Sequence, residues 1–249
     1  MNFSLSGKAA LVTGASAGLG AHFAKILAQN GARVILAARR LNALDKIASD
    51  ISAAGCEVST VALDVTDRQS IADIAGELAG IDILVNNAGV VREKAVLDQT
   101  EADWDAVLDT NLKGMFLMAQ AAARAMKDSG RGGNIINIAS ILGFRQGGAV
   151  LPYAVSKAGV IQLTKQLALE LARFGIRVNT LAPGYVKTDL NRDFWESEGG
   201  KTMIKRIPQR RIGEFEDLDG PLLLLASDAS AYMTGSAITV DGGHLVSSL

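Results

Sequence analysis

Two side chains that lie four residues apart could carry out acid–base chemistry in this chain. Tyr153 and Lys157 begin and end the stretch YAVSK, and Pro152 just before it suits the first turn of a helix. Residues four apart are neighbours on a helix surface, so we expect the ammonium group of Lys157 beside the phenol of Tyr153. A nearby cation lowers the pKa of a phenol below its ordinary value of about 10. The spacing therefore indicates a tyrosine prepared for proton transfer, with an ordinary surface pair as the alternative.

Three glycines mark a place where a nucleotide phosphate could approach the main chain. In TGASAGLG, Gly14, Gly18 and Gly20 follow the apolar run AALVT and precede a helical pattern. Glycine lets the main chain adopt positive φ and approach a ligand closely, and a helix N-terminus offers free N–H groups to an anion. The spacing G-x-x-x-G-x-G differs from the commoner dinucleotide fingerprint. It predicts a nucleotide-binding loop, with a glycine turn that binds nothing as the alternative.

The end of the second apolar run indicates which nucleotide would bind. A carboxylate at this place would accept from a ribose 2′-hydroxyl and favour NAD, but Ala38 stands there and Arg39 and Arg40 follow it. An arginine fork suits a 2′-phosphate, and the hydroxyl of Ser16 could assist it. We therefore expect NADP(H) as the cofactor. The alternative is that the two arginines only solvate a loop.

Short apolar runs alternate with helical patterns along the chain. The expected strands are 9–13, 33–38, 57–63, 81–86, 134–139, 176–182 and 236–241, and the expected helices are roughly 18–30, 41–54, 67–79, 101–127, 152–174 and 214–227. Most runs are continuously apolar, as in parallel strands covered on both faces. The alternation predicts an α/β fold, with one Rossmann-type domain over residues 1–249 and a doubly wound parallel sheet of about seven strands flanked by helices.

The composition limits the classes of partner and compartment. The chain has 249 residues, of which 49% are hydrophobic, and its net charge of −1 argues against a general nucleic-acid or anionic-membrane surface. Cys56 is the only cysteine, so no internal disulfide can form. We see no signal peptide and no apolar stretch long enough to span a membrane, and we expect a cytoplasmic protein. His22 and His244 lack metal-ligand spacing, so we expect no metal site.

Several motifs occur together in a fixed order. They are TGASAGLG, NNAG at 86–89, Asn111, Ser140, YAVSK, PGYVKT at 183–188 and ITVDGG at 238–243. With them the chain resembles the short-chain dehydrogenase/reductase family over nearly its whole length. The resemblance implies an oxidoreductase that transfers a hydride between NADP(H) and a carbonyl or secondary alcohol.

The resemblance also implies roles for individual residues. Tyr153 would exchange a proton with the substrate oxygen, which Ser140 would hold. Lys157 would bind the nicotinamide ribose and stabilise the phenolate, while Asn111, a poor residue for the middle of a helix, would support a water that relays protons. The expected cofactor-binding residues are Gly14, Ser16, Gly18, Leu19, Gly20, Arg39, Arg40, Asp64, Val65, Asn87, Ala88, Gly89, Tyr153, Lys157, Pro183, Gly184, Val186 and Thr188.

The substrate is less well defined by the sequence. We expect the segment 190–212 to cover the pocket, and the expected substrate-binding residues are Ser140, Leu142, Tyr153, Tyr185, Phe194 and Trp195. The aromatic side chains favour a hydrophobic ketone or alcohol. A basic cluster, Lys205, Arg206, Arg210 and Arg211, is expected to be a solvated face of the loop, with a phosphate or acyl-carrier partner as the alternative. It keeps a 3-oxoacyl-thioester reductase open as a second function. A non-catalytic nucleotide sensor is a further alternative, which the presence of both Tyr153 and Lys157 disfavours.

Two expected helices carry more apolar surface than one sheet face needs. These are the helices at about 101–127 and 152–174. A helix that is apolar around much of its circumference is deeply buried or packs against another subunit. The resemblance implies a symmetric homotetramer that uses these helices as a bundle.

Overall fold

Seven parallel strands form one sheet in the part of the chain that the structure describes. The structure is a computed structural model that describes residues 3–188 and 191–247. The strands are β1 (Ala9–Thr13), β2 (Arg33–Ala38), β3 (Val58–Ala62), β4 (Ile83–Asn86), β5 (Gly133–Ile138), β6 (Ile176–Pro183) and β7 (Ala237–Val240). Their order is β3-β2-β1-β4-β5-β6-β7, and every neighbouring pair is parallel. The single-domain Rossmann-like fold and the number of strands predicted from the sequence are therefore confirmed.

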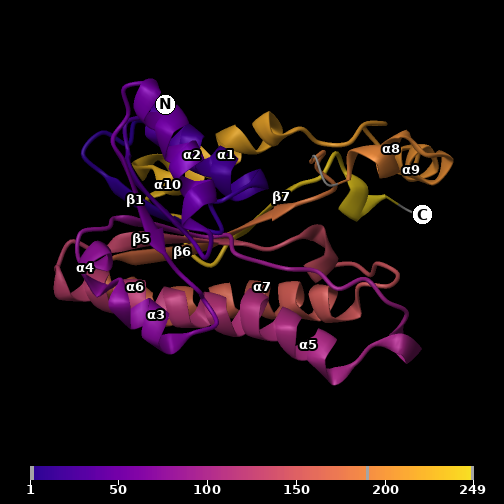
Figure 1. Cartoon of the computed structure of the whole chain (residues 1–249), viewed down its shortest axis with the longest axis horizontal. Helices are drawn as coiled ribbons and strands as arrows, with labels where there is room; N and C mark the ends of the chain where they lie inside the picture. Colours follow the sequence, from indigo (N-terminus) through magenta and orange to yellow (C-terminus); the bar gives the residue numbers. More distant parts are fainter. Residues whose placement is uncertain (1–2, 189–190, 248–249) are drawn as a thin grey trace.

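Helices cover both faces of the sheet (Figure 1). One face carries α1 (Gly18–Gln29), α2 (Leu41–Ala53) and α10 (Asp219–Ala226), and the other carries α3 (Arg68–Asp73), α4 (Ala75–Leu78), α5 (Glu101–Leu108), α6 (Met115–Asp128) and α7 (Leu151–Leu171). Two short helices, α8 (Arg192–Glu196) and α9 (Glu198–Ile204), lie at one end of the molecule (Figure 1). None of the helices in the described ranges has the length and apolar character needed to cross a bilayer.

The strands read as continuous apolar runs because both of their faces are buried. In β1, Val12 packs with Phe23 on the side of α1, whereas Leu11 packs with Met118 on the side of α6. Successive side chains of a strand point to opposite faces, so a sheet covered twice needs apolar residues at every position. The same demand explains why all five residues of β1 are buried.

The order of the strands also fixes where a ligand can bind. The connections run in opposite directions from β1, toward β2 on one side and toward β4 on the other. In an open α/β sheet, ligands bind outside the carboxyl ends of the strands at such a switch point. The glycine loop follows β1, and Ser140 follows β5, two strands away along this edge.

The expected helix at 101–127 is divided in three. After α5 the chain forms a π-helical segment, η2 (Asp109–Gly114), before α6 continues in the same direction. The expected helix at 152–174 is α7, followed by a 3₁₀ turn at Ala172–Phe174 and by Gly175 with φ of 70°. That glycine ends the helix as predicted, because it adopts the left-handed conformation common at helix ends.

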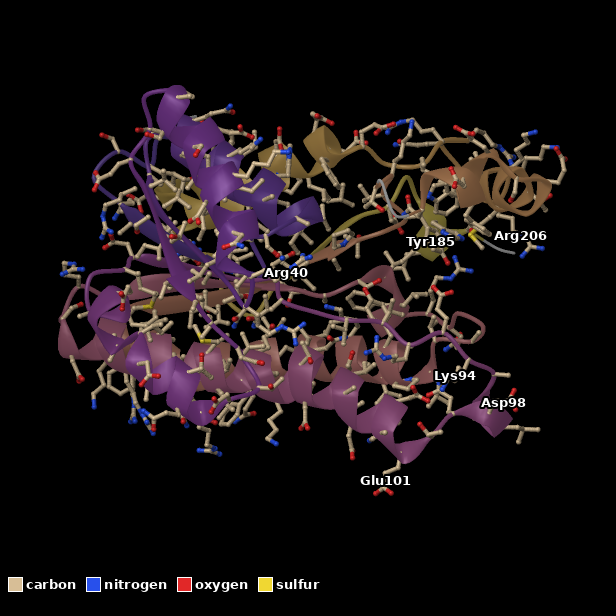
Figure 2. The ribbon with its side chains drawn as sticks, viewed as in Figure 1. Arg40, Lys94, Asp98, Glu101, Tyr185 and Arg206 are labelled. Atoms are coloured by element: carbon tan, nitrogen blue, oxygen red, sulfur yellow. The ribbon has the colours of Figure 1, made fainter. Side chains whose placement is uncertain are left out.

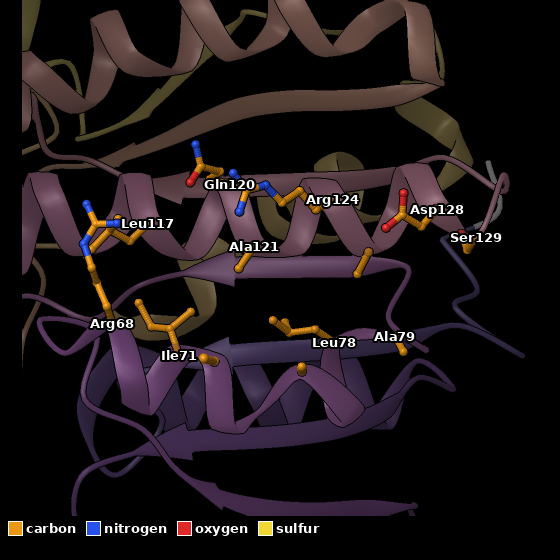
Figure 3. Close-up of a pocket in the computed structure, with 13 residues that line it drawn as sticks. Arg68, Ile71, Leu78, Ala79, Leu117, Gln120, Ala121, Arg124, Asp128 and Ser129 are labelled. Carbon is orange, nitrogen blue, oxygen red and sulfur yellow. The ribbon is translucent and has the colours of Figure 1, made fainter.

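A cavity of about 620 Å³ lies between α6 and the pair α3 and α4. Figure 3 shows Ile71 and Leu78 facing Leu117 and Ala121 across it. The cavity belongs to the helical layer of the molecule and not to the edge of the sheet where the strands end. It is therefore separate from the candidate active site.

Candidate active site

Ser140 and Tyr153 meet at the carboxyl edge of the sheet. Ser140 lies just beyond β5, and its Oγ accepts from the main-chain N–H of Leu142 at 3.1 Å while its hydroxyl donates to the phenol of Tyr153. The 3₁₀ turn η3 (Ile141–Gly143) lets this loop approach α7 closely. A Cβ at Gly143 would lie 2.8 Å from the main chain of Lys157, so a larger residue would separate the two segments. The structure thus brings two of the predicted catalytic groups into contact.

Lys157 lies one turn further along α7 and is almost fully buried. Its Nζ donates to the main-chain oxygen of Ile138 at 2.7 Å and lies 5.5 Å from the centre of the Tyr153 ring. Burial lowers the pKa of its ammonium group from 10.5 to about 8, because the charged form loses its hydration. The spacing of four residues on a helix therefore does place the lysine beside the tyrosine, as the sequence predicted.

The pKa of Tyr153 corrects one expectation. Burial raises this pKa above its ordinary value, the hydrogen bond from Ser140 lowers it in part, and the nearby phenol of Tyr185 raises it further. The sequence predicted that Lys157 would lower it. In the protein alone, loss of hydration outweighs the hydrogen bond, so Tyr153 is held as a neutral phenol that can donate a proton.

Asn111 lies in the π-helical segment η2 and is fully buried. Its Oδ1 accepts from the main-chain N–H of Val90 at 2.8 Å, and its Nδ2 donates to the main-chain oxygen of Val90 at 2.9 Å and to Ser156 Oγ at 3.1 Å. The Ser156 hydroxyl in turn donates to the main-chain oxygen of Tyr153 at 2.7 Å. π-Helical turns are rare and occur often at functional sites. Asn111 thus ties the loop after β4 to the helix that carries the tyrosine.

The glycine loop is held against the end of β4 by side chains. Thr13 Oγ1 accepts from the main-chain N–H groups of Asn87 and Ala88, each at 3.0 Å, and Asn87 Nδ2 donates to the main-chain oxygen of Thr13 at 3.0 Å. A Cβ at Gly20 would lie 2.3 Å from the main-chain oxygen of Gly14, far inside van der Waals contact. Glycine is therefore required at this position, because α1 could not otherwise start so close to the loop.

A cavity of about 450 Å³ opens in front of this loop. Eleven of the predicted cofactor-binding residues line it: Gly14, Ser16, Leu19, Arg39, Arg40, Asp64, Val65, Asn87, Ala88, Gly89 and Thr188. The lining also contains residues that were not predicted as ligands: Ala17, Ala37, Ala38, Leu63, Val90 and Thr110. Most of them are at strand ends or next to a motif, so extending each motif by one residue would have found several.

The other predicted cofactor residues lie outside this cavity. They are Gly18, Gly20, Tyr153, Lys157, Pro183, Gly184 and Val186. Tyr153 and Lys157 lie beyond β5, and Pro183 ends β6, so these residues stand further along the same edge of the sheet. Their contacts with a cofactor stay predictions.

The cavity is positively charged where β2 ends. Arg40 Nη2 donates to Ser16 Oγ at 3.2 Å, which links the arginine pair to the glycine loop. Asp64 lines the same cavity and accepts from Thr66 N at 2.9 Å and from Thr66 Oγ1 at 2.7 Å. Partial burial raises the pKa of this carboxyl, but the two bonds from Thr66 and the charge of Arg39 outweigh it and lower the pKa. These groups could hold a nucleotide that carries an additional phosphate.

The predicted substrate residues gather at the far end of the edge. The ring of Tyr185 lies 5.3 Å from that of Trp195, which in turn lies 4.9 Å from that of Phe194. Trp195 is buried, whereas Phe194 is 46% exposed. Figure 2 shows Tyr185 toward the end of the molecule that carries α8 and α9, and Arg40 nearer the middle. Leu190, where the expected covering segment begins, is outside the described residues.

Comparisons with known proteins agree with this arrangement. The family described as short chain dehydrogenase matches residues 8–199. A gluconate 5-dehydrogenase of Gluconobacter oxydans is 40% identical over 98% of this chain and 97% of its own, and a 3-oxoacyl-[acyl-carrier-protein] reductase of Thermotoga maritima is 39% identical over 97% and 99%. The crystal structure of a gluconate 5-dehydrogenase from Burkholderia cenocepacia, in complex with NADP and tartrate, superposes with a TM-score of 0.92 at 36% identity over 98% of both chains. The chain belongs to the short-chain dehydrogenase family.

Proposed function

We propose that this protein is an NADP(H)-dependent oxidoreductase that interconverts a carbonyl compound and a secondary alcohol, with Tyr153 as the proton donor and acceptor. The contact between Ser140 and Tyr153, with Lys157 one turn away, carries the proposal. These groups lie next to a cavity that is lined by glycines and arginines. Such a neighbourhood suits a reaction in which a bound nucleotide and a proton donor act on one substrate.

The residues of the cavity fit NADP(H). The close approach at Gly20 leaves a main-chain cradle in front of α1, and the helix N-terminus favours an anion there. Arg39 and Arg40 are exposed at the end of β2, where Arg40 already contacts Ser16 of the loop. Two guanidinium groups suit a phosphate dianion better than a neutral hydroxyl. The Burkholderia cenocepacia relative with bound NADP supports the same choice.

The chemistry divides between the cofactor and the side chains. NADPH, when bound, supplies the hydride. Tyr153 donates its phenolic proton to the carbonyl oxygen, so that the carbonyl group, a hydride and a proton together give the alcohol. Ser140 donates its single hydroxyl proton to that oxygen and stabilises the negative charge that develops on it. Lys157 is positioned to replace the proton, since a pKa of about 8 makes its ammonium group a ready donor near neutral pH.

Replacement of Tyr153 by phenylalanine tests this assignment. The variant keeps the ring and loses the ionisable oxygen, so NADPH should bind almost as in the wild type while turnover falls at least ~100-fold. Tyr232→Phe is the matched control, because Tyr232 is fully exposed and should tolerate the same change. Near-normal turnover by Tyr153→Phe would refute the role. If the wild-type protein binds NADPH but reduces none of the carbonyl compounds tested, it is a nucleotide sensor and not a reductase.

Two substrate classes from the sequence stay proposals. A hydrophobic ketone or alcohol is supported by the exposed ring of Phe194 and its neighbours. A 3-oxoacyl thioester is supported by the Thermotoga maritima relative and by the basic cluster. Within that cluster, Arg211 is already bound to Asp217 through two hydrogen bonds of 2.6 and 2.8 Å, so less positive charge is free than the sequence suggested.

A screen of NADPH oxidation would separate these classes. The panel should contain aryl ketones, diketones, an acetoacetyl thioester and oxo acids. The acids are included because two of the relatives are named as gluconate 5-dehydrogenases. A preference of at least tenfold in kcat/KM for one class would assign it.

A further inference from the structure

Arg145 is a half-buried cation with no carboxylate partner among the described residues. It follows the turn η3, five residues after Ser140, and one of its Nη groups donates to the main-chain oxygen of His244 in the 3₁₀ turn η7 (His244–Val246). Within the described ranges, no other N–H group of its guanidinium forms a hydrogen bond, and the guanidinium forms no ion pair. A guanidinium has five N–H donors in a rigid fork, so most of its donors are free.

Arg145 stands beside the aromatic group that leads to the catalytic tyrosine. The ring of Tyr185 lies 5.5 Å from that of His244, whose main chain holds the arginine. Burial raises the pKa of Tyr185, and the charge of Arg145 opposes this rise more strongly than the carboxylate of Glu93 adds to it. The positive charge of Arg145 therefore acts on Tyr185. Tyr185 in turn raises the pKa of Tyr153, so the ring of Tyr185 lies close enough to act electrostatically on the catalytic tyrosine.

Two buried polar atoms in the same group also lack partners within residues 3–188 and 191–247. They are Nδ1 of His244 and Nε1 of Trp195, whose rings both contact that of Tyr185. His244 and Trp195 are only 6% and 7% exposed. A buried polar group without a hydrogen bond costs folding free energy, so such groups usually face a ligand or a water. The group of Tyr185, Trp195 and His244 therefore suits a polar substrate, which could bond to these atoms, better than a purely apolar one.

A purely structural role is the simplest alternative for Arg145. Its bond to His244 could serve only to hold the C-terminal turn on the loop after β5. A neutral donor would suffice for that single bond, and it would avoid the cost of a half-buried charge without a counterion. The unused part of the fork therefore indicates a second, anionic partner.

We propose that Arg145 is a specificity-determining residue that binds a carboxylate of the substrate, so that the enzyme acts on oxo acids and the corresponding hydroxy acids. This inference rests on the proposed function, because it assigns the substrate class of the same site. The carboxylate would accept two parallel N–H bonds from the guanidinium. The reacting carbonyl group would then lie toward Ser140 and Tyr153, on the other side of Tyr185.

Matched acids and esters test the proposal. Levulinate and acetoacetate are compared with their methyl esters in NADPH oxidation by the wild type, Arg145→Gln and Arg145→Lys. The wild type should prefer each acid by at least tenfold in kcat/KM. Arg145→Gln should reduce kcat/KM for the acids by about 10- to 150-fold, mainly through KM, as expected for loss of a hydrogen bond to a charged group. The kcat/KM of Arg145→Gln for the esters should change less than threefold. The kcat/KM of Arg145→Lys for the acids should lie between those of the wild type and Arg145→Gln.

The control is Arg124→Gln, which removes an exposed arginine from α6, at the separate cavity of the helical layer (Figure 3). An equal loss for acids and esters in Arg145→Gln would show that Arg145 is only an anchor for the C-terminal turn. A wild type without preference for the acids would also overturn the inference, while leaving the proposed function intact.

Binding separates failure of the inference from failure of the proposed function. Levulinate should raise the Tm of the NADP-saturated wild type more than methyl levulinate does, and Arg145→Gln should lose this difference. If no carbonyl compound is reduced, the proposed function fails and the melting curves alone decide the inference. Equal shifts for levulinate in both proteins would overturn it.

Discussion

Removing the buried lysine should make the protein more stable while it stops the reaction. Burial lowers the pKa of Lys157 from 10.5 to about 8, which corresponds to a cost of about 3–4 kcal/mol for keeping the ammonium group in the folded protein at neutral pH. The bond from Nζ to the main-chain oxygen of Ile138 offsets about 1.5–3 kcal/mol of this cost. Methionine has a stem of similar length and no charge. We therefore expect Lys157→Met to raise the free energy of unfolding by about 0.5–2 kcal/mol at pH 7.

The pH dependence of this difference identifies its cause. Between pH 8 and 10.5 the unfolded chain holds a proton on Lys157 that the folded protein has released. Stability of the wild type therefore rises with pH in this window, relative to a variant that lacks the group. From pH 7 to pH 9 the free energy of unfolding of the wild type should rise by roughly 1 kcal/mol relative to that of Lys157→Met. Other titrating groups are common to both proteins and cancel in the comparison.

Urea unfolding at pH 7 and pH 9, in the absence of nucleotide, measures both effects. Lys46→Met, which changes an exposed lysine on α2, is the matched control and should show no pH-dependent difference. NADPH oxidation by Lys157→Met should fall at least ~100-fold, because the proton supply to Tyr153 is lost. A difference in unfolding free energy that stays constant between the two pH values would refute the reasoning. It would mean that Lys157 remains charged in the folded protein well above pH 9.

Three further predictions concern the cofactor, the glycine loop and assembly. Arg39→Leu should weaken the binding of NADPH by about 10- to 150-fold and the binding of NADH much less. The double variant Ala38→Asp, Arg39→Leu should prefer NADH over NADPH in kcat/KM. Equal weakening of both cofactors by Arg39→Leu would place the 2′-phosphate elsewhere. Gly20→Ala should cost about 1–3 kcal/mol in urea unfolding and weaken NADPH, because its Cβ would meet a main-chain oxygen at 2.3 Å; unchanged stability would contradict this. We also predict a homotetramer, to be measured by light scattering, because Leu169 on α7 and Phe116 on α6 are apolar and 76% and 37% exposed. Leu169→Asp should dissociate it. A wild-type monomer at micromolar concentration would disprove the prediction.

The sequence predicts the scaffold of this protein well because the scaffold follows repeating patterns. A sheet covered on both faces needs continuous apolar runs, and each of the seven runs is a strand in the described structure. Motifs at strand ends could then be placed on one edge, which is why eleven predicted cofactor residues line a single cavity. Spacing on a helix placed Lys157 beside Tyr153 for the same reason.

The features that the sequence did not predict depend on contacts between distant segments. Asn111 is a poor residue for the middle of a helix, but the sequence did not show that it lies in a π-helical turn or that its side chain bonds to Val90, twenty-one residues away in the chain. The raised pKa of Tyr153 depends on burial, which a pattern of neighbours on one helix cannot show. Arg145 carried no motif at all. Its bond to His244 joins segments separated by ninety-nine residues.

The two ends of the site differ in how completely their polar groups are satisfied. At the proton-transfer end, Asn111 and Lys157 are buried, and both are held by main-chain oxygens whose positions the sheet and the π-turn fix. At the other end, buried polar atoms of His244 and Trp195 have no hydrogen-bond partner in the part of the chain that the structure describes, and most guanidinium donors of Arg145 are unused there. Groups that must act in every turnover benefit from being fixed in advance, since no reorganisation is then needed during the reaction. Groups left unsatisfied can be completed by only some substrates, so this end of the site is where the enzyme can discriminate between them.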